Sequence, residues 1–351
     1  MARLIGNRMK NENNWRNRYS RQTVFHGIGG EGQQKLGQSK AVIIGCGALG
    51  CNIANLLVRA GVGKVRIVDR DFVEYHNLQR QTLFDENDVK SRLPKAIAAG
   101  KHLKAINSLV EIESIVADVN SNNVEEYCAG SDVILDGMDN LETRYLVNDI
   151  SLKLGIPYIY GGAISSIGMT MTVMPGVSPC FRCVFPDPPP QRTMPTCETD
   201  GILGPTAAIV SSMEAAEAIK ILVGSPFINK DLITLDIWDI SFERYPIVRK
   251  EGCPSCNGRY DFLGKKKGLI KTSLCGQARA VQVVDMESKG IDLHQLAARL
   301  TGVQEVYYNE YMLSFDAGDC TITVFTDGRA IIKNTLDESL AEVLYRKYIR
   351  A

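Results

Sequence analysis

An apolar run that leads directly into a glycine-rich turn constrains the fold of this chain more than any other stretch. Residues 40–44 are KAVII, and residues 45–50 are GCGALG, with glycines at Gly45, Gly47 and Gly50. Such glycines let a strand turn sharply into a helix whose N-terminus can approach a phosphate group. A helix-compatible segment and a second apolar run, KVRIV, follow the turn. We therefore expect an α/β fold with a Rossmann-like, doubly wound, mostly parallel sheet.

Strand and helix patterns keep alternating to about residue 240. Helices are expected at Leu49–Ala60, Pro94–Ile106, Leu141–Leu154 and 206–222, and strands at Lys64–Val68, Val110–Ile115, Asp132–Leu135, Tyr158–Tyr160, Ile167–Met174 and 232–240. The Pro-rich stretch at 184–205 predicts an exposed crossing loop, because proline fixes φ and removes a hydrogen-bond donor.

The length of 351 residues is too great for one compact core. The composition changes near 257–270, NGRYDFLGKKKG, and short strand and helix patterns with a hairpin signal at Asp327-Gly328 follow. We expect a flexible N-terminal tail at 1–14, a main domain at 15–262 and a small α+β domain at 268–351.

Charge and hydropathy argue against two classes of partner. The 40 Lys and Arg residues balance the 40 Asp and Glu residues, so no overall positive field attracts nucleic acid or a membrane surface. The N-terminal segment lacks the apolar core of a signal peptide, and no apolar run approaches the roughly 20 residues of a membrane span. We expect a cytoplasmic protein that holds any anionic ligand by a local cluster.

The glycine turn alone fits NAD, ATP or a tight turn without a ligand. Asp69 ends the second strand, where an acid can bind a ribose hydroxyl. Asn77, Arg80 and Gln81 come next, and Lys95 follows in SRLPKA. Two cations and several amide donors beyond the ribose acid favour a triphosphate over the pyrophosphate of NAD.

Asp139, in DGMDN, follows a predicted strand and so lies at the expected ligand edge of the sheet. A carboxylate there can bind Mg²⁺ together with nucleotide phosphates. Each residue also has an ordinary alternative: Arg80 in a surface ion pair, Lys95 on a solvated helix face, and Asp139 as the cap of the helix near Leu141. Their occurrence together and in this order favours a nucleotide site.

The cysteines fall into three groups. Cys180 with Cys183 and Cys253 with Cys256 form two C-x-x-C pairs, which indicate a structural Zn²⁺ site with a redox dithiol as the alternative. Cys197 lies in the Pro-rich loop, outside both pairs. The remaining thiols are expected in cores: Cys46, Cys51, Cys128, Cys275 and Cys320.

Several motifs together resemble the ThiF/MoeB superfamily, relatives of the ubiquitin-activating enzymes. They are RYSRQ at 18–22, GCGALG, VDRD, NLQRQ, LPK, DGMDN, both cysteine pairs and PTCETDGILGP, in order over roughly residues 16–260. The resemblance implies an adenylation domain that activates the C-terminal glycine of a ubiquitin-like sulfur carrier ending in Gly-Gly. It also implies ATP, Mg²⁺ and Zn²⁺ as cofactors.

The resemblance further implies individual roles. Asp69 would bind the ribose, Ala48 would contact the nucleotide through its backbone, and Asn77, Arg80 and Lys95 would hold the phosphates. Asp139 would bind Mg²⁺, and Arg21 would reach the γ-phosphate bound by the partner of a homodimer. Cys197 matches a cysteine that can link covalently to the carrier. The other residues expected at the nucleotide are Gly45, Gly47, Gly50, Asp71, Gln81 and Asn140.

The tail, with SLCGQARAVQV, TVFTDGRAIIK and LYRKYI, resembles the C-terminal extension of a subset of bacterial ThiF proteins. That favours the thiamine-thiazole carrier ThiS. The sequence leaves the sulfur donor open, with a cysteine desulfurase or a rhodanese as the candidates. A molybdopterin or tRNA-thiolation carrier and a peptide substrate remain open, as do an NAD-dependent oxidoreductase and a scaffold without activity. No residue of the tail suggests chemistry, so a contact or stabilising role is expected there.

Overall fold

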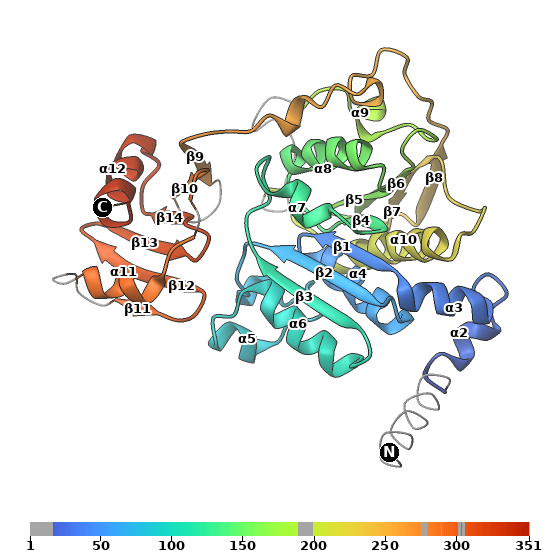
Figure 1. Cartoon of the computed structure of the whole chain (residues 1–351), viewed down its shortest axis with the longest axis horizontal. Helices are drawn as coiled ribbons and strands as arrows, with labels where there is room; N and C mark the ends of the chain where they lie inside the picture. The colour runs from blue at the N-terminus through green and yellow to red at the C-terminus, as the bar shows by residue number, and fades with distance from the viewer. Residues whose placement is uncertain are drawn as a thin grey trace. The chain divides into compact units, whose positions relative to one another are not determined.

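A computed structural model describes residues 17–188, 199–274, 279–288, 290–300, 303 and 306–350. The chain divides into two compact units, which are described separately (Figure 1). The first takes in the chain up to Ile115 together with Val119–Leu263, and the second takes in Val116–Asp118 together with Gly264–Ala351.

The first unit is built on an eight-stranded sheet in the order β3-β2-β1-β4-β5-β6-β7-β8. β2, β1, β4 and β5 pair in parallel, and the pairs β5–β6, β6–β7 and β7–β8 are antiparallel. The strands are β1 (Lys40–Ile44), β2 (Lys64–Asp69), β3 (Glu111–Val116), β4 (Val133–Asp136), β5 (Tyr158–Ile164), β6 (Ile167–Val173), β7 (Leu232–Asp236) and β8 (Ser241–Tyr245). The expected α/β class is confirmed, with a mostly parallel, mixed sheet.

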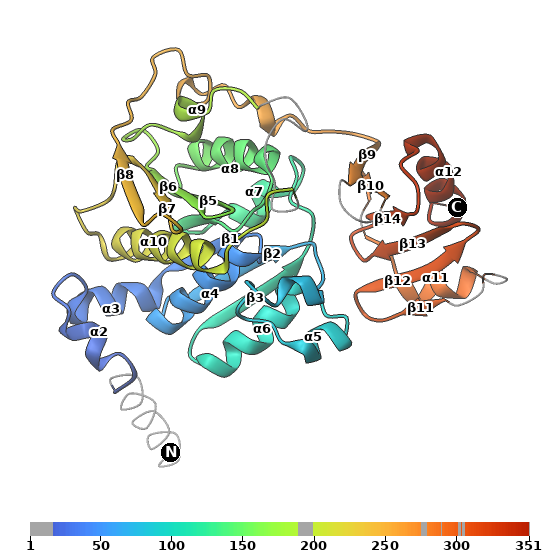
Figure 2. The ribbon, with the colours of Figure 1, turned by 180° about the vertical axis from the view of Figure 1, so that it is seen from behind.

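Helices cover both faces of this sheet (Figures 1 and 2). α4 (Ala48–Ala60), α6 (Lys95–Ile106) and α10 (Gly204–Val223) lie on one face, and α7 (Val124–Cys128) and α8 (Leu141–Leu154) on the other. This arrangement follows from right-handed crossovers between parallel strands. The shorter helices are α2 (Ser20–Val24), α3 (Gly29–Gln38), α5 (Glu86–Lys90), α9 (Phe181–Val184), η1 (Tyr75–Asn77), η2 (Ser255–Asn257) and η3 (Asp261–Leu263).

The core of the first unit lies between the sheet and α4, α6 and α10. Ile43, Leu57 and Leu135 are fully buried there. Each such side chain contributes roughly 1.5–3 kcal/mol by leaving water, which is why β1 and β4 are nearly all apolar. Strand order reverses between β1 and β4, so the carboxyl ends of these two strands form the ligand edge of the sheet.

The second unit is a six-stranded antiparallel sheet in the order β11-β12-β13-β14-β10-β9, with two helices. Its buried core includes Val283, Leu296 and Ile322. The predicted hairpin at Asp327-Gly328 joins β13 to β14, and Gly328 has a φ of 87°. Its elements are β9 (Leu269–Leu274), β10 (Ala280–Asp285), α11 (Leu293–Arg299), β11 (Tyr307–Tyr308), β12 (Met312–Ala317), β13 (Cys320–Phe325), β14 (Ala330–Lys333) and α12 (Glu338–Tyr348).

One predicted strand is too long, and several short elements were not predicted. The strand expected at 232–240 ends at Asp236, whose Oδ1 accepts hydrogen bonds from Trp238 N at 2.9 Å and Asp239 N at 3.4 Å. This side chain turns the backbone and sends the chain back as β8. The unpredicted elements are α2, α5, α7, α9, β8, β9 and β11. Among the described helices, none has the length and apolar character needed to cross a lipid bilayer.

Candidate functional site

The turns after β1 and β4 pack against each other at the strand-order reversal. Gly45 has a φ of 91°, and a Cβ there would lie 2.5 Å from the Gly137 carbonyl oxygen. A Cβ on Gly50 would lie 2.0 Å from the Gly45 carbonyl oxygen. Only glycine fits at these two positions, because a side chain would collide with backbone atoms that cannot give way. The glycines therefore shape the turn, whether or not a ligand is bound.

Gly47 differs from Gly45 and Gly50 because a side chain there would meet its neighbours at ordinary contact distance and would not collide with the backbone. A Cβ there would lie no closer than 3.6 Å to a protein atom, the Gly137 carbonyl oxygen. Gly47 is the N-cap of α4, and no side chain in the described structure caps this helix, which begins at Ala48. An uncapped helix N-terminus with free N–H groups and an open approach is suited to an anion such as phosphate.

Asp69 ends β2, next to the glycine turn. Its Oδ2 accepts a hydrogen bond from Cys46 N at 2.5 Å, and its Oδ1 accepts one from Asp71 N at 2.6 Å. Burial raises the pKa of Asp69, while the charge of Lys95 and the two backbone donors act in the opposite direction. The backbone therefore fixes the orientation of the carboxylate, and each oxygen keeps a lone pair for a hydroxyl group.

Lys95 is the first residue of α6, and its side chain is only 9% exposed. Its Nζ lies 3.3 Å from Asp71 Oδ2. Burial alone would lower the pKa of Lys95, but the carboxylates of Asp71, Asp69 and Asp139 outweigh it and raise the pKa. The ammonium group thus stays charged beside three acids, two from the end of β2 and the residues just after it and one from the loop after β4. The alternative of a solvated helix face is wrong for Lys95.

The alternative of Asp139 as a helix cap is also wrong. Asn140 is the N-cap of α8, and its side-chain oxygen accepts a hydrogen bond from Thr143 N at 2.9 Å. Asp139 is exposed, and within the described residues its carboxylate has no hydrogen-bond partner. An exposed carboxylate at the ligand edge, beside the Lys95 charge, has the donor chemistry that Mg²⁺ prefers.

Three predicted residues lie in η1 or just after it, and one of them, Gln81, reaches the glycine turn. Gln81 is buried, its Oε1 has no hydrogen-bond partner in the described chain, and its Nε2 lies 4.0 Å from the Cβ position of Gly47. Asn77 is buried, and its Oδ1 accepts a hydrogen bond from Glu74 N at 3.0 Å. The amide group of Gln81 therefore lies close to the turn, whereas the contact of Asn77 is within its own segment.

Arg80 is half-buried, and its Nη1 donates to the His76 carbonyl oxygen at 2.8 Å. Among the described residues no carboxylate forms an ion pair with it, so the surface ion-pair alternative is not observed. A Cβ on Gly204, the first residue of α10, would lie 3.8 Å from the Arg80 Cα. Arg80 therefore keeps most of its donors available for an anionic ligand.

Arg21 does not lie with the other predicted residues. It is exposed on α2, and the neighbouring Gln22 donates to the Ala60 carbonyl oxygen at 2.8 Å, at the C-terminal end of α4. α4 has 13 residues and is therefore about 20 Å long, with the glycine turn at its other end. Arg21 consequently lies a full helix length from the nucleotide site of its own chain.

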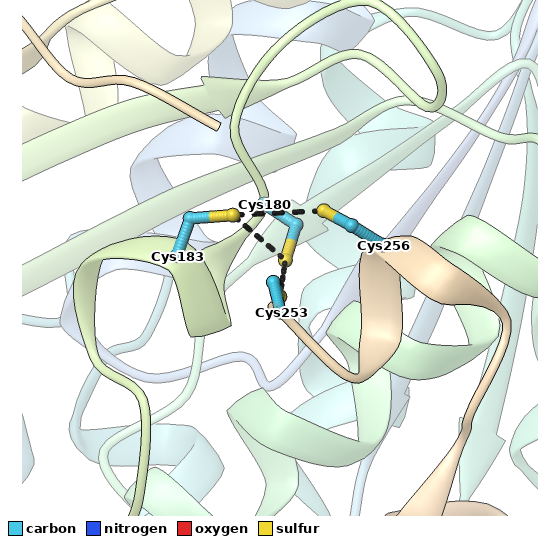
Figure 3. A group of neighbouring side chains, drawn as sticks. All are labelled: Cys180, Cys183, Cys253 and Cys256. Atoms are coloured by element: carbon cyan, nitrogen blue, oxygen red, sulfur yellow. Dashed lines mark hydrogen bonds between the residues drawn. The ribbon is translucent and has the colours of Figure 1, made fainter. Parts of the chain in front are cut away.

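The two cysteine pairs form a second candidate site (Figure 3). The sulfur–sulfur distances are 3.9 Å for Cys180–Cys183, 3.5 Å for Cys180–Cys253 and 3.6 Å for Cys183–Cys256. Zn–S bonds of about 2.3 Å place tetrahedral ligands about 3.8 Å apart. Four thiols at this spacing, all free of disulfides, could bind a metal ion.

Polar contacts hold the two cysteine segments in place. Asp149 Oδ1 accepts a hydrogen bond from the Ser255 hydroxyl at 2.5 Å, and Arg182 Nη1 donates to Asp261 Oδ2 at 3.0 Å. Of the predicted core thiols, Cys46, Cys51, Cys128 and Cys320 are buried. Cys197 and Cys275 lie outside the described residues.

Sequence patterns did not reveal one polar cluster beneath the Asp139 loop. Asp136 is fully buried, and its Oδ2 accepts hydrogen bonds from Arg144 Nε at 2.9 Å and the Tyr158 hydroxyl at 2.7 Å. Burial raises the pKa of Asp136, and the charge of Arg144 opposes this effect. The available signal was weak: an acid at the end of an apolar strand, and an arginine on the next helix.

Known proteins with similar sequences and folds show the family of the chain. The ThiF family model matches residues 19–255. The sulfur carrier protein ThiS adenylyltransferase of Bacillus subtilis is 41% identical over 336 residues, which cover 95% of this chain and 99% of that protein. The sulfur carrier protein adenylyltransferase of Thermus thermophilus is 39% identical over 246 residues, 68% of this chain and 90% of that protein.

Among solved structures, E. coli MccB with ATP shares the fold, with a TM-score of 0.59 and 24% identity over 68% of this chain and 74% of that one. The family model spans well over half of the sequence, and the B. subtilis relative is matched along nearly its whole length. The chain therefore belongs to the ThiF family.

Proposed function

We propose that this chain is an adenylyltransferase that uses ATP to activate the C-terminal glycine carboxylate of a ThiS-like sulfur carrier for thiocarboxylate formation. One observation carries the proposal: Lys95, amid three carboxylates, lies with Asp69 and Asp71 beside the glycine turn and the uncapped start of α4. The relatives named as carrier adenylyltransferases support the choice of substrate. Family membership removes the support for an NAD-dependent oxidoreductase.

The residues of the site suit this reaction. A carboxylate is already ionised at neutral pH, so its attack on the α-phosphorus requires no general base. Two anions must approach each other as pyrophosphate leaves, so the chain must supply positive charge and alignment. Lys95 and Arg80 would supply charge, and Asp69 would orient the ribose. Mg²⁺, held by Asp139 and phosphate oxygens, would supply further positive charge when bound.

The function is tested by incubating the pure chain with ATP, Mg²⁺ and candidate carriers that end in Gly-Gly. We expect the cognate carrier to gain the mass of AMP, with release of pyrophosphate, because the carboxylate becomes an acyl adenylate. Intact-mass spectrometry of each carrier measures the adduct. A carrier with its terminal glycine deleted is the matched control and should stay unmodified.

The outcome also separates the alternatives. The carrier that responds distinguishes ThiS-like, molybdopterin and tRNA-thiolation carriers, and a modified peptide would name the remaining substrate class. If folded carriers and peptides all stay unmodified, the proposed activity is wrong, and the result favours a scaffold without activity. A covalent role for Cys197 would appear as a larger adduct on this chain that disappears with reductant.

We also propose a homodimer in which Arg21 completes the site of the partner. The support is its position, exposed and a helix length away from its own nucleotide site. Arg21→Ala and Lys95→Ala should each be nearly inactive, because each removes a cation from every site. Mixing them in equal amounts should restore about a quarter of wild-type activity, because half of random dimers are mixed and carry one complete site.

Activity of the mixture is measured by pyrophosphate exchange after the subunits have been exchanged. Two Arg21→Ala preparations mixed with each other provide the control. No restoration in a mixture that contains mixed dimers would show that Arg21 does not act across the interface.

We further propose Zn²⁺ at the four cysteines, a sulfur donor protein as a later partner, a cytoplasmic location and a stabilising role for residues 268–351.

A further inference from the structure

Arg144 links three parts of the backbone beneath the candidate nucleotide site. It lies on α8, and its side chain is 9% exposed. Its Nε donates to Asp136 Oδ2 at 2.9 Å, and its Nη2 donates to the carbonyl oxygens of Met138 at 2.7 Å and Gly161 at 2.8 Å. One guanidinium thus joins the end of β4, the loop after it and strand β5.

Asp136 holds the same loop from its other side. Its Oδ1 accepts a hydrogen bond from Met138 N at 2.9 Å, and its Oδ2 also accepts one from the Tyr158 hydroxyl at 2.7 Å. Met138 is therefore fixed at both its N–H and its carbonyl group. The peptide unit that joins Met138 to Asp139 is planar, so fixing the carbonyl also fixes the direction in which Asp139 leaves the loop.

The charges in this cluster favour a specific pairing. Glu214 on α10 is fully buried, and in the described chain neither of its oxygens has a hydrogen-bond partner. Burial raises the pKa of Glu214 well above its ordinary value, and the charge of Asp136 adds to this effect. The charge of Arg144 acts on Glu214 in the opposite direction, but the direct partner of Arg144 is Asp136, whose Oδ2 lies 2.9 Å from its Nε. Removing either Asp136 or Arg144 would leave the buried charge of the other without a partner.

We propose that Asp136 and Arg144 are positioning residues that hold Asp139 in the orientation needed to bind Mg²⁺ with the nucleotide phosphates. The proposal rests on the proposed function, since Mg·ATP is the ligand that this loop would meet. Neither residue need touch the nucleotide, because both act through the peptide unit before Asp139.

The test is Arg144→Lys, which keeps a positive charge but replaces the planar fork with a single ammonium group that cannot make all three bonds. The first measurement is the Mg²⁺ concentration for half-maximal binding of a non-hydrolysable ATP analogue, by calorimetry. We expect it to rise about 10-fold or more, since a misplaced ligand weakens the metal site. Pyrophosphate exchange at a fixed, sub-saturating Mg²⁺ concentration should fall with it, mainly through a higher KM for Mg·ATP.

Glu214→Gln is the matched control in the same cluster. The amide has the shape of the carboxyl group, and Glu214 makes no hydrogen bond to the Met138 peptide in the described structure, so the Mg²⁺ midpoint should stay within about 2-fold of wild type. A lysine variant that folds and keeps the wild-type Mg²⁺ midpoint would overturn the proposal. A rise that Glu214→Gln matches would also overturn it, because general disturbance of the core would then explain both.

If Arg144→Lys does not fold, Tyr158→Phe takes its place. It removes one hydrogen bond to Asp136 and should shift the Mg²⁺ midpoint upward about 3-fold. An unchanged Mg²⁺ midpoint in Tyr158→Phe would overturn the positioning role of Asp136 and Arg144. The binding measurement needs no carrier. A wild-type chain that binds Mg²⁺ and the analogue but adenylates nothing would refute the proposed function and leave this inference standing.

Discussion

Lys95→Ala is expected to slow adenylation at least about 100-fold, which is the typical cost of removing one charge that stabilises a transition state. The ammonium group is buried, 3.3 Å from Asp71, and close enough to Asp69 and Asp139 for all three acids to raise its pKa. Without it, three carboxylates would face a triphosphate with no compensating charge. The loss should appear mainly in kcat, because the charge on the phosphates moves as pyrophosphate leaves.

The measurement is steady-state pyrophosphate exchange, with the fold checked by circular dichroism. Lys101→Ala is the control, because Lys101 lies on the same helix and is exposed. It should leave the rate unchanged. Near-normal turnover in Lys95→Ala would refute the role assigned to Lys95. An equal loss of activity in Lys101→Ala would show that disturbance of helix α6, and not loss of the Lys95 charge, causes the effect.

The part of the site around the glycine turn could be predicted because its signals are local. An apolar strand, a glycine at positive φ and an acid at the end of the next strand each follow from a few neighbouring residues. Gly45, Asp69 and Lys95 were predicted in this way, and the structure brings all three regions to one edge of the sheet. Whether each binds the nucleotide remains a proposal.

Other features depend on residues far apart in sequence and could not be predicted. β8 is exposed at all five positions, so it has no alternating apolar pattern and exists because it pairs with β7. The contact between the Gly45 and Gly137 turns requires β1 and β4 to be neighbours. In the sequence, Arg144 cannot be distinguished from an exposed arginine on a helix. It is buried against Asp136 only because α8 packs on the sheet.

Arg21 illustrates a different limit. The family resemblance implied that Arg21 reaches the γ-phosphate bound by a partner chain, but no residue pattern along the sequence could test that assignment. The position of α2 at the far end of α4 excludes its own site and makes the partner the reasonable choice. The position of Arg21 is thus compatible with the homodimer that the resemblance implied.

Loss of the cysteine-bound metal is expected to be the largest change in stability. Cys253→Ser should reduce the zinc content from about one per chain to near zero and lower the thermal midpoint by roughly 10 °C. The ion would join two segments 73 residues apart, and three of its four ligands are buried. Without it, thiolates at spacings of 3.5–3.9 Å would repel one another or take up protons.

Elemental analysis and scanning calorimetry measure the two effects, and Cys128→Ala is the control for loss of a buried thiol outside the cluster. That variant should keep its zinc and lose only about 1 kcal/mol of stability, the cost of a small cavity. Four thiolates leave no open position on a tetrahedral ion, so adenylation by Cys253→Ser below its melting point should continue. Wild-type protein without metal, but with a C-x-x-C disulfide that reductant opens, would instead establish the redox dithiol.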